Sequence, residues 1–195
     1  CIRDSYMDCP DRERAQWWGD EVNELGEAFY ALSPSGQKLA VKGIHELMNW
    51  QREDGTLYAP VPAGNWDKEL PLQMLASIGW YGFYTQYYYS ADSSFVPVIY
   101  DRMRRYLHEV WQVDKSGLVI ERQGAWSWGD WGEHVDMGVL TNCWYYLALK
   151  AERAFALQLG KDKDADEISR MMRSIERCFD TKFWTGLSLI HISEP

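Results

Sequence analysis

The chain has 195 residues, which is enough for one ordinary domain or for part of a larger one. Its formal net charge of −9 at pH 7 argues against nucleic acid or an anionic membrane as partner, because both bind clustered Lys and Arg. No apolar run approaches the roughly 20 residues of a membrane-spanning helix. The four cysteines form no CxxC or Cys/His cluster typical of zinc sites.

Hydrophobic periodicity predicts six helices along the chain. They cover residues 17–32, 37–52, 70–89, 95–113, 135–159 and 165–179, with a short strand-like segment at 118–121. The third helix is apolar on nearly all faces, which is typical of a helix buried between others. The pattern therefore predicts an all-α fold made of three helical hairpins.

Long connections alternate with short turns between the predicted helices. The three long segments are 8–20, 56–67 and 124–134, and each contains both Trp and Asp. Helices joined tightly at one end and by long loops at the other place the long loops on one face, where functional sites usually lie. We therefore expect these three segments to form a single site.

The sequence is rich in large aromatic residues, with 11 Trp and 12 Tyr. A large helical core would account for many of them. Trp and Tyr also combine an apolar ring with a polar tip, which suits a carbohydrate pocket or a protein interface. The aromatic content leaves the structural and the functional interpretation both open.

Segment 8–20, Asp-Cys-Pro-Asp-Arg-Glu-Arg-Ala-Gln-Trp-Trp-Gly-Asp, is the densest cluster of candidate functional residues. Carboxyl groups beside bulky aromatics are typical of sugar-cleaving sites, where the carboxyl groups transfer protons. A structural interpretation is that Glu13 pairs with Arg12 or Arg14 at a helix start. Asp20 could likewise be a helix N-cap.

The same segment closely resembles the start of the catalytic domain in bacterial α-L-rhamnosidases of glycoside hydrolase family 78. In that family Asp-Cys-Pro is followed by Arg, an acidic residue and Trp-x-Gly-Asp. The corresponding residues here are Asp8-Cys9-Pro10, Arg12, Glu13 and Trp17-Trp18-Gly19-Asp20. One departure is Asp11, which stands where the family usually has Gln.

Two later segments extend the resemblance. Gly129-Asp130-Trp131 is similar to the family's Gly-Asp-Trp element, and Trp66-Asp67 stands where another sugar-binding aspartate is expected. The resemblance implies an (α/α)6 barrel of the six-hairpin glycosidase type, of which residues 1–186 would form about half. It implies inverting hydrolysis of terminal α-L-rhamnose from a glycan or glycoside.

The resemblance also implies roles for individual residues. Glu13 is the expected general acid. The residues expected to contact the sugar are Asp8, Arg12, Trp17, Asp20, Trp66, Asp67, Asp130 and Trp131. We expect no cofactor, and we recognise no set of metal ligands in the sequence.

An inverting glycosidase needs a second carboxylate, roughly 6.5–9.5 Å from the acid, to activate water. In the family this base lies in the second half of the barrel, which would place it beyond residue 195. We therefore expect the chain to be inactive alone. Residues 187–195 continue no helical pattern, and we expect them to be a non-native tail.

Two other interpretations stay open. A different (α/α)6 glycosidase, such as a fucosidase-, glucuronyl- or trehalase-like enzyme, would share the architecture. A non-catalytic helical carbohydrate-binding protein would use the aromatic residues without chemistry.

Overall fold

The computed structural model describes residues 5–9, 11–63, 67–70, 72–122, 126–127, 135–184 and 186. The helices are α1 (Trp18–Ala31), α2 (Gly36–Asn49), the 3₁₀ helix η1 (Leu72–Ile78), α3 (Phe83–Ser90), α4 (Val96–Arg105), the π-helical turn η2 (Tyr106–Val110), α5 (Met137–Gln158) and α6 (Asp162–Phe183). Within these residues, β-structure is limited to isolated bridges. The predicted all-α fold is confirmed, and no described helix is long and apolar enough to cross a membrane.

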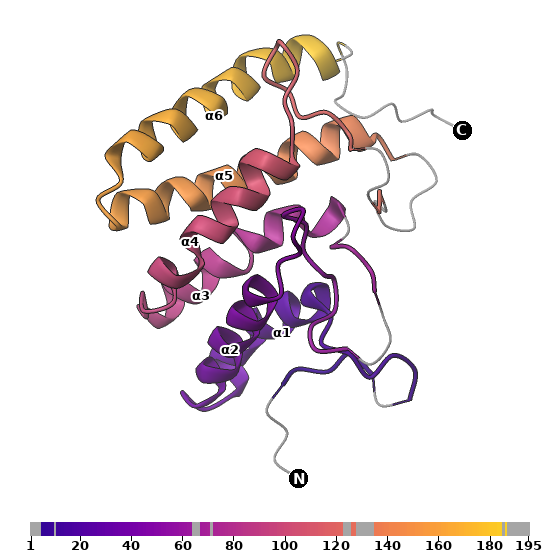
Figure 1. Cartoon of the computed structure of the whole chain (residues 1–195), viewed down its shortest axis with the longest axis vertical. Coiled ribbons are helices and arrows are strands. Elements are labelled where there is room, and N and C mark those ends of the chain that lie inside the picture. Colours follow the sequence, from indigo (N-terminus) through magenta and orange to yellow (C-terminus); the bar gives the residue numbers. More distant parts are fainter. Residues whose placement is uncertain are drawn as a thin grey trace.

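The helices succeed one another through the molecule. Figure 1 shows α1 and α2 at one end and α5 and α6 at the other, with α3 and α4 between them. Short turns join α1 to α2 and α5 to α6, so each pair forms a hairpin. The helix η1 packs against both α1 and α5 and so connects the first hairpin to the last.

Aromatic side chains fill much of the core between these helices. The ring of Phe155 in α5 lies 5.9 Å from Tyr87, 6.2 Å from Tyr84 and 6.3 Å from Phe95, measured between centroids. Trp18 at the start of α1 packs edge-on against Phe83 at 5.4 Å. The structural interpretation of the aromatic content is therefore correct for these residues.

The prediction of one continuous third helix over residues 70–89 is wrong. The segment contains η1 and α3, separated by the turn 79–82. Gly79 at this turn lies so close to α5 that a Cβ atom would come within 2.7 Å of the Ala148 Cα atom. Packing against α5 therefore explains glycine here, which marks the break that periodicity alone missed.

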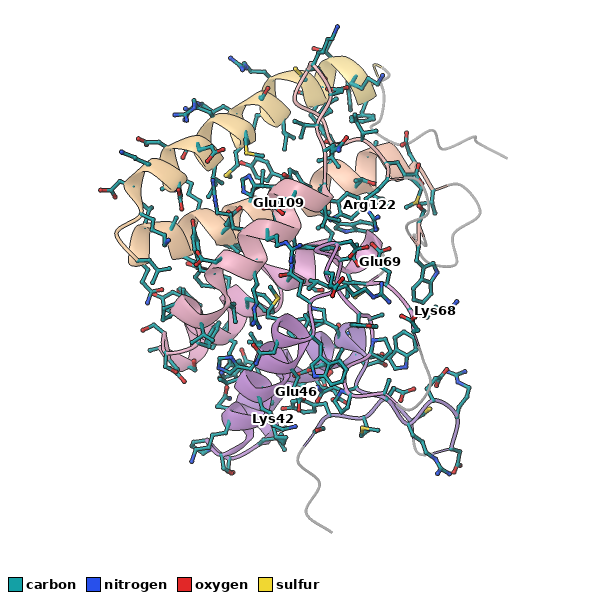
Figure 2. The ribbon with its side chains drawn as sticks, viewed as in Figure 1. Lys42, Glu46, Lys68, Glu69, Glu109 and Arg122 are labelled. Atoms are coloured by element: carbon teal, nitrogen blue, oxygen red, sulfur yellow. The ribbon has the colours of Figure 1, made fainter. Side chains whose placement is uncertain are left out.

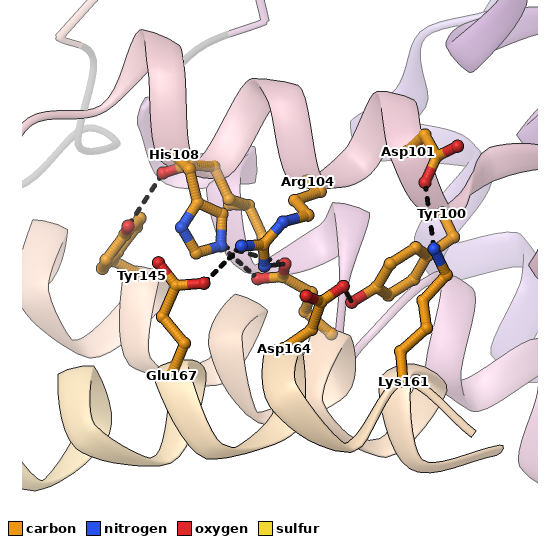
Figure 3. Close-up of polar contacts among 10 residues, drawn as sticks. Tyr100, Asp101, Arg104, His108, Tyr145, Lys161, Asp164 and Glu167 are labelled. Atoms are coloured by element: carbon orange, nitrogen blue, oxygen red, sulfur yellow. Dashed lines mark hydrogen bonds and ion pairs between the residues drawn. The ribbon is translucent and has the colours of Figure 1, made fainter. Parts of the chain in front are cut away.

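A polar cluster joins α4 and η2 to α5 and α6 (Figure 3). The Glu152 side chain is fully buried, and both of its carboxyl oxygens lie 2.9 Å from His108 Nε2. Arg104 pairs with Glu152 at 3.3 Å and also with Glu167. Tyr145 donates a hydrogen bond of 2.8 Å from its hydroxyl to a main-chain carbonyl of η2. These bonds hold the turn η2 in place. The helical structure ends with this turn at Val110, three residues before the predicted end of the fourth helix at residue 113.

Candidate functional site

The opening segment forms a loop whose two ends are hydrogen-bonded to each other. The Asp8 N–H donates to the Ala15 carbonyl at 3.1 Å, and the Ala15 N–H donates to Asp8 Oδ1 at 3.0 Å. Between them, Arg14 has a φ of 52°, in the left-handed region that non-glycine residues rarely adopt. Such a conformation costs roughly 1–3 kcal/mol and is typical of functional loops. Contacts around the loop must therefore hold it in place.

Gln16 fastens this loop to the second long segment and to α2. Its N–H donates to the Pro62 carbonyl at 2.9 Å, and its carbonyl accepts from the Val61 N–H at 3.0 Å. Its side-chain amide donates to Glu46 Oε2 at 2.8 Å. Gln16 is 2% exposed, so these bonds are shielded from water and anchor the base of the loop.

The third long segment also reaches this face. The Trp17 and Trp126 rings meet edge to face, with centroids 6.2 Å apart. Glu69, which follows the second segment, pairs with Arg122, which precedes the third, and Figure 2 shows the two labelled side chains next to each other. The described parts of the three segments therefore contact one another, and their forming a single site stays a prediction.

Asp8, Cys9 and Glu13 form a compact cluster at the centre of the loop. The Cys9 Sγ atom lies 2.9 Å from Asp8 Oδ2 and 3.0 Å from Glu13 Oε2. It also accepts a hydrogen bond of 3.3 Å from the Glu13 N–H. Because a thiol has one hydrogen, Cys9 donates to one carboxyl group at a time. The cysteine therefore bridges the two carboxyl groups.

Electrostatics separate the two aspartates of this segment. Desolvation raises the pKa of Asp8, but hydrogen bonds from the Cys9 thiol and the Ala15 N–H, among others, outweigh it and lower the pKa to about 2. Desolvation and the negative charge of Asp8 raise the pKa of Asp20. Asp20 lies in the first turn of α1, whose N-cap is Trp17, so the N-cap interpretation of Asp20 is wrong.

Arg12 pairs directly with Glu13. Its Nε atom lies 2.5 Å from Glu13 Oε1. The Arg12 side chain is 80% exposed, whereas that of Glu13 is 12% exposed. Glu13 thus lies in the wall of the site with one oxygen facing Cys9 and the other facing Arg12, which stands at the solvent side.

Asp67, another predicted sugar contact, is not brought into this cluster. Asp67 is paired with Arg52, and its side chain is 79% exposed. In the described part of the chain it forms no hydrogen bond or ion pair with Asp8 or Glu13. The remaining predicted contacts are outside the described residues: Trp66, Asp130 and Trp131.

Sequence reasoning missed the contributions of Cys9 and Gln16. Cys9 precedes Glu13 by four residues and follows Asp8 directly, which was the available signal for a side chain lying between them. Gln16 has no such signal, because its partners lie about 30 and 45 residues away along the chain. Only the folded arrangement of the second segment identifies it as the anchor.

Within the described part of the chain, the same cluster is the group of His, Cys, Asp and Glu side chains that could hold a metal ion. One ligand atom from each of Asp8, Cys9 and Glu13 lies within 4.8 Å of the others. Their mutual hydrogen bonds already satisfy these atoms, which is a sufficient reason for the arrangement without an ion. The sequence alone did not identify this group as a set of metal ligands.

These features define a helical-hairpin protein with an acidic site where long loops meet. The family model for the bacterial alpha-L-rhamnosidase six-hairpin glycosidase domain matches residues 1–193. The chain therefore belongs to the bacterial α-L-rhamnosidase six-hairpin glycosidase family. The match includes residues 187–193 of the segment 187–195, which lies outside the described residues. The assignment of this segment as a non-native tail stays a prediction.

Two solved structures have the same fold. The alpha-L-rhamnosidase from Dictyoglumus thermophilum is 18% identical with a TM-score of 0.72, over 93% of this chain and 21% of that one. The rhamnosidase from Klebsiella oxytoca with rhamnose bound is 17% identical with a TM-score of 0.75, over 94% of this chain and 36% of that one. The chain thus spans 21% and 36% of the lengths of these two proteins. The comparison with curated protein sequences gives no match.

Proposed function

We propose that the chain carries the acid side of an inverting α-L-rhamnosidase site, with Glu13 as the general acid. The observation that carries this proposal is the cluster of Asp8, Cys9 and Glu13 beside the Trp17–Trp126 pair, in a chain of this family. The rhamnose bound to the Klebsiella oxytoca protein supports a carbohydrate substrate.

In this mechanism Glu13 donates its proton to the glycosidic oxygen as the bond from that oxygen to the anomeric carbon breaks. A water molecule attacks the anomeric carbon from the opposite face and gives up a proton to a general base. The leaving alcohol keeps the proton of Glu13, and the carboxylate is then reprotonated from solvent. No net oxidation or reduction occurs.

The ionised Asp8 has a different role. Because its pKa is about 2, it stays a hydrogen-bond acceptor at neutral pH and can accept from a sugar hydroxyl. We assign the neighbouring sugar contacts to Arg12, Trp17 and Asp20, with Trp66, Asp67, Asp130 and Trp131 completing the pocket. For Asp67 this requires that it exchange its partner Arg52 for the substrate.

We place the general base outside the 195-residue chain. One carboxyl oxygen each of Asp8 and Glu13 lie within 4.8 Å of each other, whereas the inverting geometry needs about 6.5–9.5 Å between acid and base to admit water. The chain alone is then a sugar-binding half-site. A longer protein that contains it would be the active enzyme.

Binding and hydrolysis test the two parts of the proposal separately. L-rhamnose added to the chain should shift the NMR signals of the Trp17 and Trp126 indole groups, and Asp8→Asn should weaken this response. Glu13→Gln should leave binding in place but abolish release of an aryl α-L-rhamnoside by a longer, active protein. Hydrolysis of another aryl glycoside instead, with none of the rhamnoside, would reject the rhamnosidase assignment in favour of a different glycosidase. Glu13-dependent hydrolysis by the 195-residue chain would reject the placement of the base.

A further inference from the structure

A pocket lies at the end of the first hairpin where α1 joins α2, away from the candidate active site. It has a volume of about 700 Å³ and is formed by the end of α1, the start of α2 and the end of α3. The candidate active site lies before the first residue of α1, and this 14-residue helix is about 21 Å long. The pocket is therefore separate from the Asp8–Glu13 cluster.

One residue that lines this pocket has a buried amide with no hydrogen-bond partner in the described part of the chain. Gln86 lines the pocket and is 0% exposed, yet neither its Nε2 nor its Oε1 atom has a hydrogen-bond partner among the described residues. The Oε1 atom of Gln37, which also lines the pocket, is likewise buried and unpartnered. A buried polar group that is left unpaired destabilises the folded protein. These three atoms are therefore the unsatisfied hydrogen-bonding groups of this pocket among the described residues.

Aromatic rings form one wall of the pocket. Phe29 and Tyr89 lie with their centroids 5.2 Å apart and their planes inclined by 36°. Tyr89 is 57% exposed, so part of its ring is accessible to a molecule in the pocket. An exposed aromatic ring with a hydroxyl at its tip suits a ligand that has both apolar and polar faces.

The rim carries one charge of each sign. Lys38 and Asp92 both line the pocket, and Lys38 forms no ion pair with any described residue. Hydrogen bonds from Ser94 lower the pKa of Asp92, which is therefore ionised at neutral pH. With opposite charges at its rim, the pocket favours neither an anion nor a cation.

We propose that this pocket is a second binding site, for a neutral sugar. A sugar hydroxyl both donates and accepts hydrogen bonds, and the Gln86 amide offers a donor and an acceptor side by side. The faces of a pyranose ring are apolar enough to lie against Tyr89. The volume is within the range of about 300–1,000 Å³ found for small-molecule sites, which leaves room for more than one sugar unit.

The test is a titration of the 195-residue chain with four neutral sugars: L-rhamnose, D-glucose, D-galactose and cellobiose. The side-chain amide NMR signals of Gln86 and Gln37 should shift with at least one of them. Gluconate, an anion of similar size, should bind more weakly than glucose. Gln86→Met should weaken binding at this pocket by about tenfold or more, since it removes two hydrogen-bonding atoms while keeping the side-chain volume.

Controls distinguish this site from the proposed active site and from a folding defect. Gln112→Met changes an exposed glutamine elsewhere and should leave binding unchanged. Glu13→Gln should also leave the Gln86 response unchanged, even if the proposed rhamnosidase activity fails. Gln86→Met should keep or raise the melting temperature, because it removes an unpaired buried amide. If that variant does not fold, Tyr89→Ala on the exposed wall should weaken sugar binding instead.

Three results would overturn the proposal. The first is a Gln86 signal that responds to none of the four sugars, which would leave ordered water as the partner of the amide. The second is a response confined to Trp17 and Trp126. The third is unchanged binding in the folded Gln86→Met variant.

Discussion

The carboxyl group of Glu21 in α1 fills the space that a side chain on Gly43 in α2 would need. A Cβ atom at position 43 would overlap both carboxyl oxygens of Glu21. Glu21 is 1% exposed, and neither oxygen has a hydrogen-bond partner among the described residues. The first hairpin is thus closed around a buried acid, and glycine at position 43 permits the close approach.

Gly43→Ala should destabilise the protein by about 1–3 kcal/mol, although alanine is the better helix former. The reason is that the buried Glu21 side chain has little room to move away. Urea unfolding measures the change. Gly26→Ala is the matched control, because no atom lies near a Cβ at position 26 of α1, and it should stabilise by up to about 1 kcal/mol. Equal gains from both substitutions would contradict the predicted overlap.

Glu21 should also make stability depend on pH. Burial, followed by the negative charges of Glu46 and Glu24, raises its pKa from 4.5 to about 9. A group with a raised pKa in the folded state contributes stability below its unfolded pKa and loses it as pH rises toward the folded value. Stability should therefore fall between pH 4.5 and about 9. Glu21→Gln should flatten this decline and add on the order of 2–3 kcal/mol at neutral pH.

The measurement is urea unfolding of both proteins across that pH range. The neighbouring acids Glu24 and Glu46 remain in both proteins, so the difference between the two curves isolates Glu21. Parallel curves would contradict a buried, protonated Glu21.

How much of this structure the sequence predicts depends on the range of the interactions involved. The helices at α1 and α5 follow from local apolar spacing, and segment 8–20 attracts attention by its residue types alone. The break at Gly79 depends on how closely α5 approaches, which periodicity cannot reveal. The buried Glu21 was not predicted, because nothing in its local sequence places the carboxyl group against α2.

Long-range pairing also decides which acidic residues share the site. Asp8 and Glu13 are five residues apart, and one loop brings them together around Cys9. Asp67 also lies beside a tryptophan in the sequence, yet the fold pairs it with Arg52. Residue type therefore identified candidate acids, whereas only the folded chain shows that Asp8 and Glu13 share one cluster and that Asp67 pairs with Arg52.

Cys9 should control the ionisation of Asp8. Cys9→Ala removes the thiol hydrogen bond and should raise the Asp8 pKa from about 2 toward its ordinary value of 3.8. Because the low pKa contributes stability that is lost as pH falls from 3.8 toward 2, the variant should lose some of its stability above this range. Carboxyl ¹³C NMR titration measures the change directly.

Cys9→Ser is the control for this substitution, since a hydroxyl keeps a hydrogen-bond donor at the same position. It should hold the Asp8 pKa near that of the unchanged protein. If alanine and serine at position 9 give the same Asp8 titration, the bridging role of the cysteine is refuted.

The buried Glu152 joins α5 to α4 and η2, and removing it should be among the most damaging polar substitutions in this chain. Glu152→Leu removes the carboxyl group that pairs with His108 and one of the two ion-pair partners of Arg104. Breaking one side of a buried ion pair typically costs about 3–5 kcal/mol. Glu167→Gln breaks only the ion pair between Arg104 and Glu167. The Glu167 side chain is 46% exposed, so this pair lies nearer the surface. Such a pair contributes about 0–1 kcal/mol. Urea unfolding of the two variants should therefore differ severalfold in effect, and a comparable loss in both would show that the cluster acts as a surface network instead of a buried joint between helices.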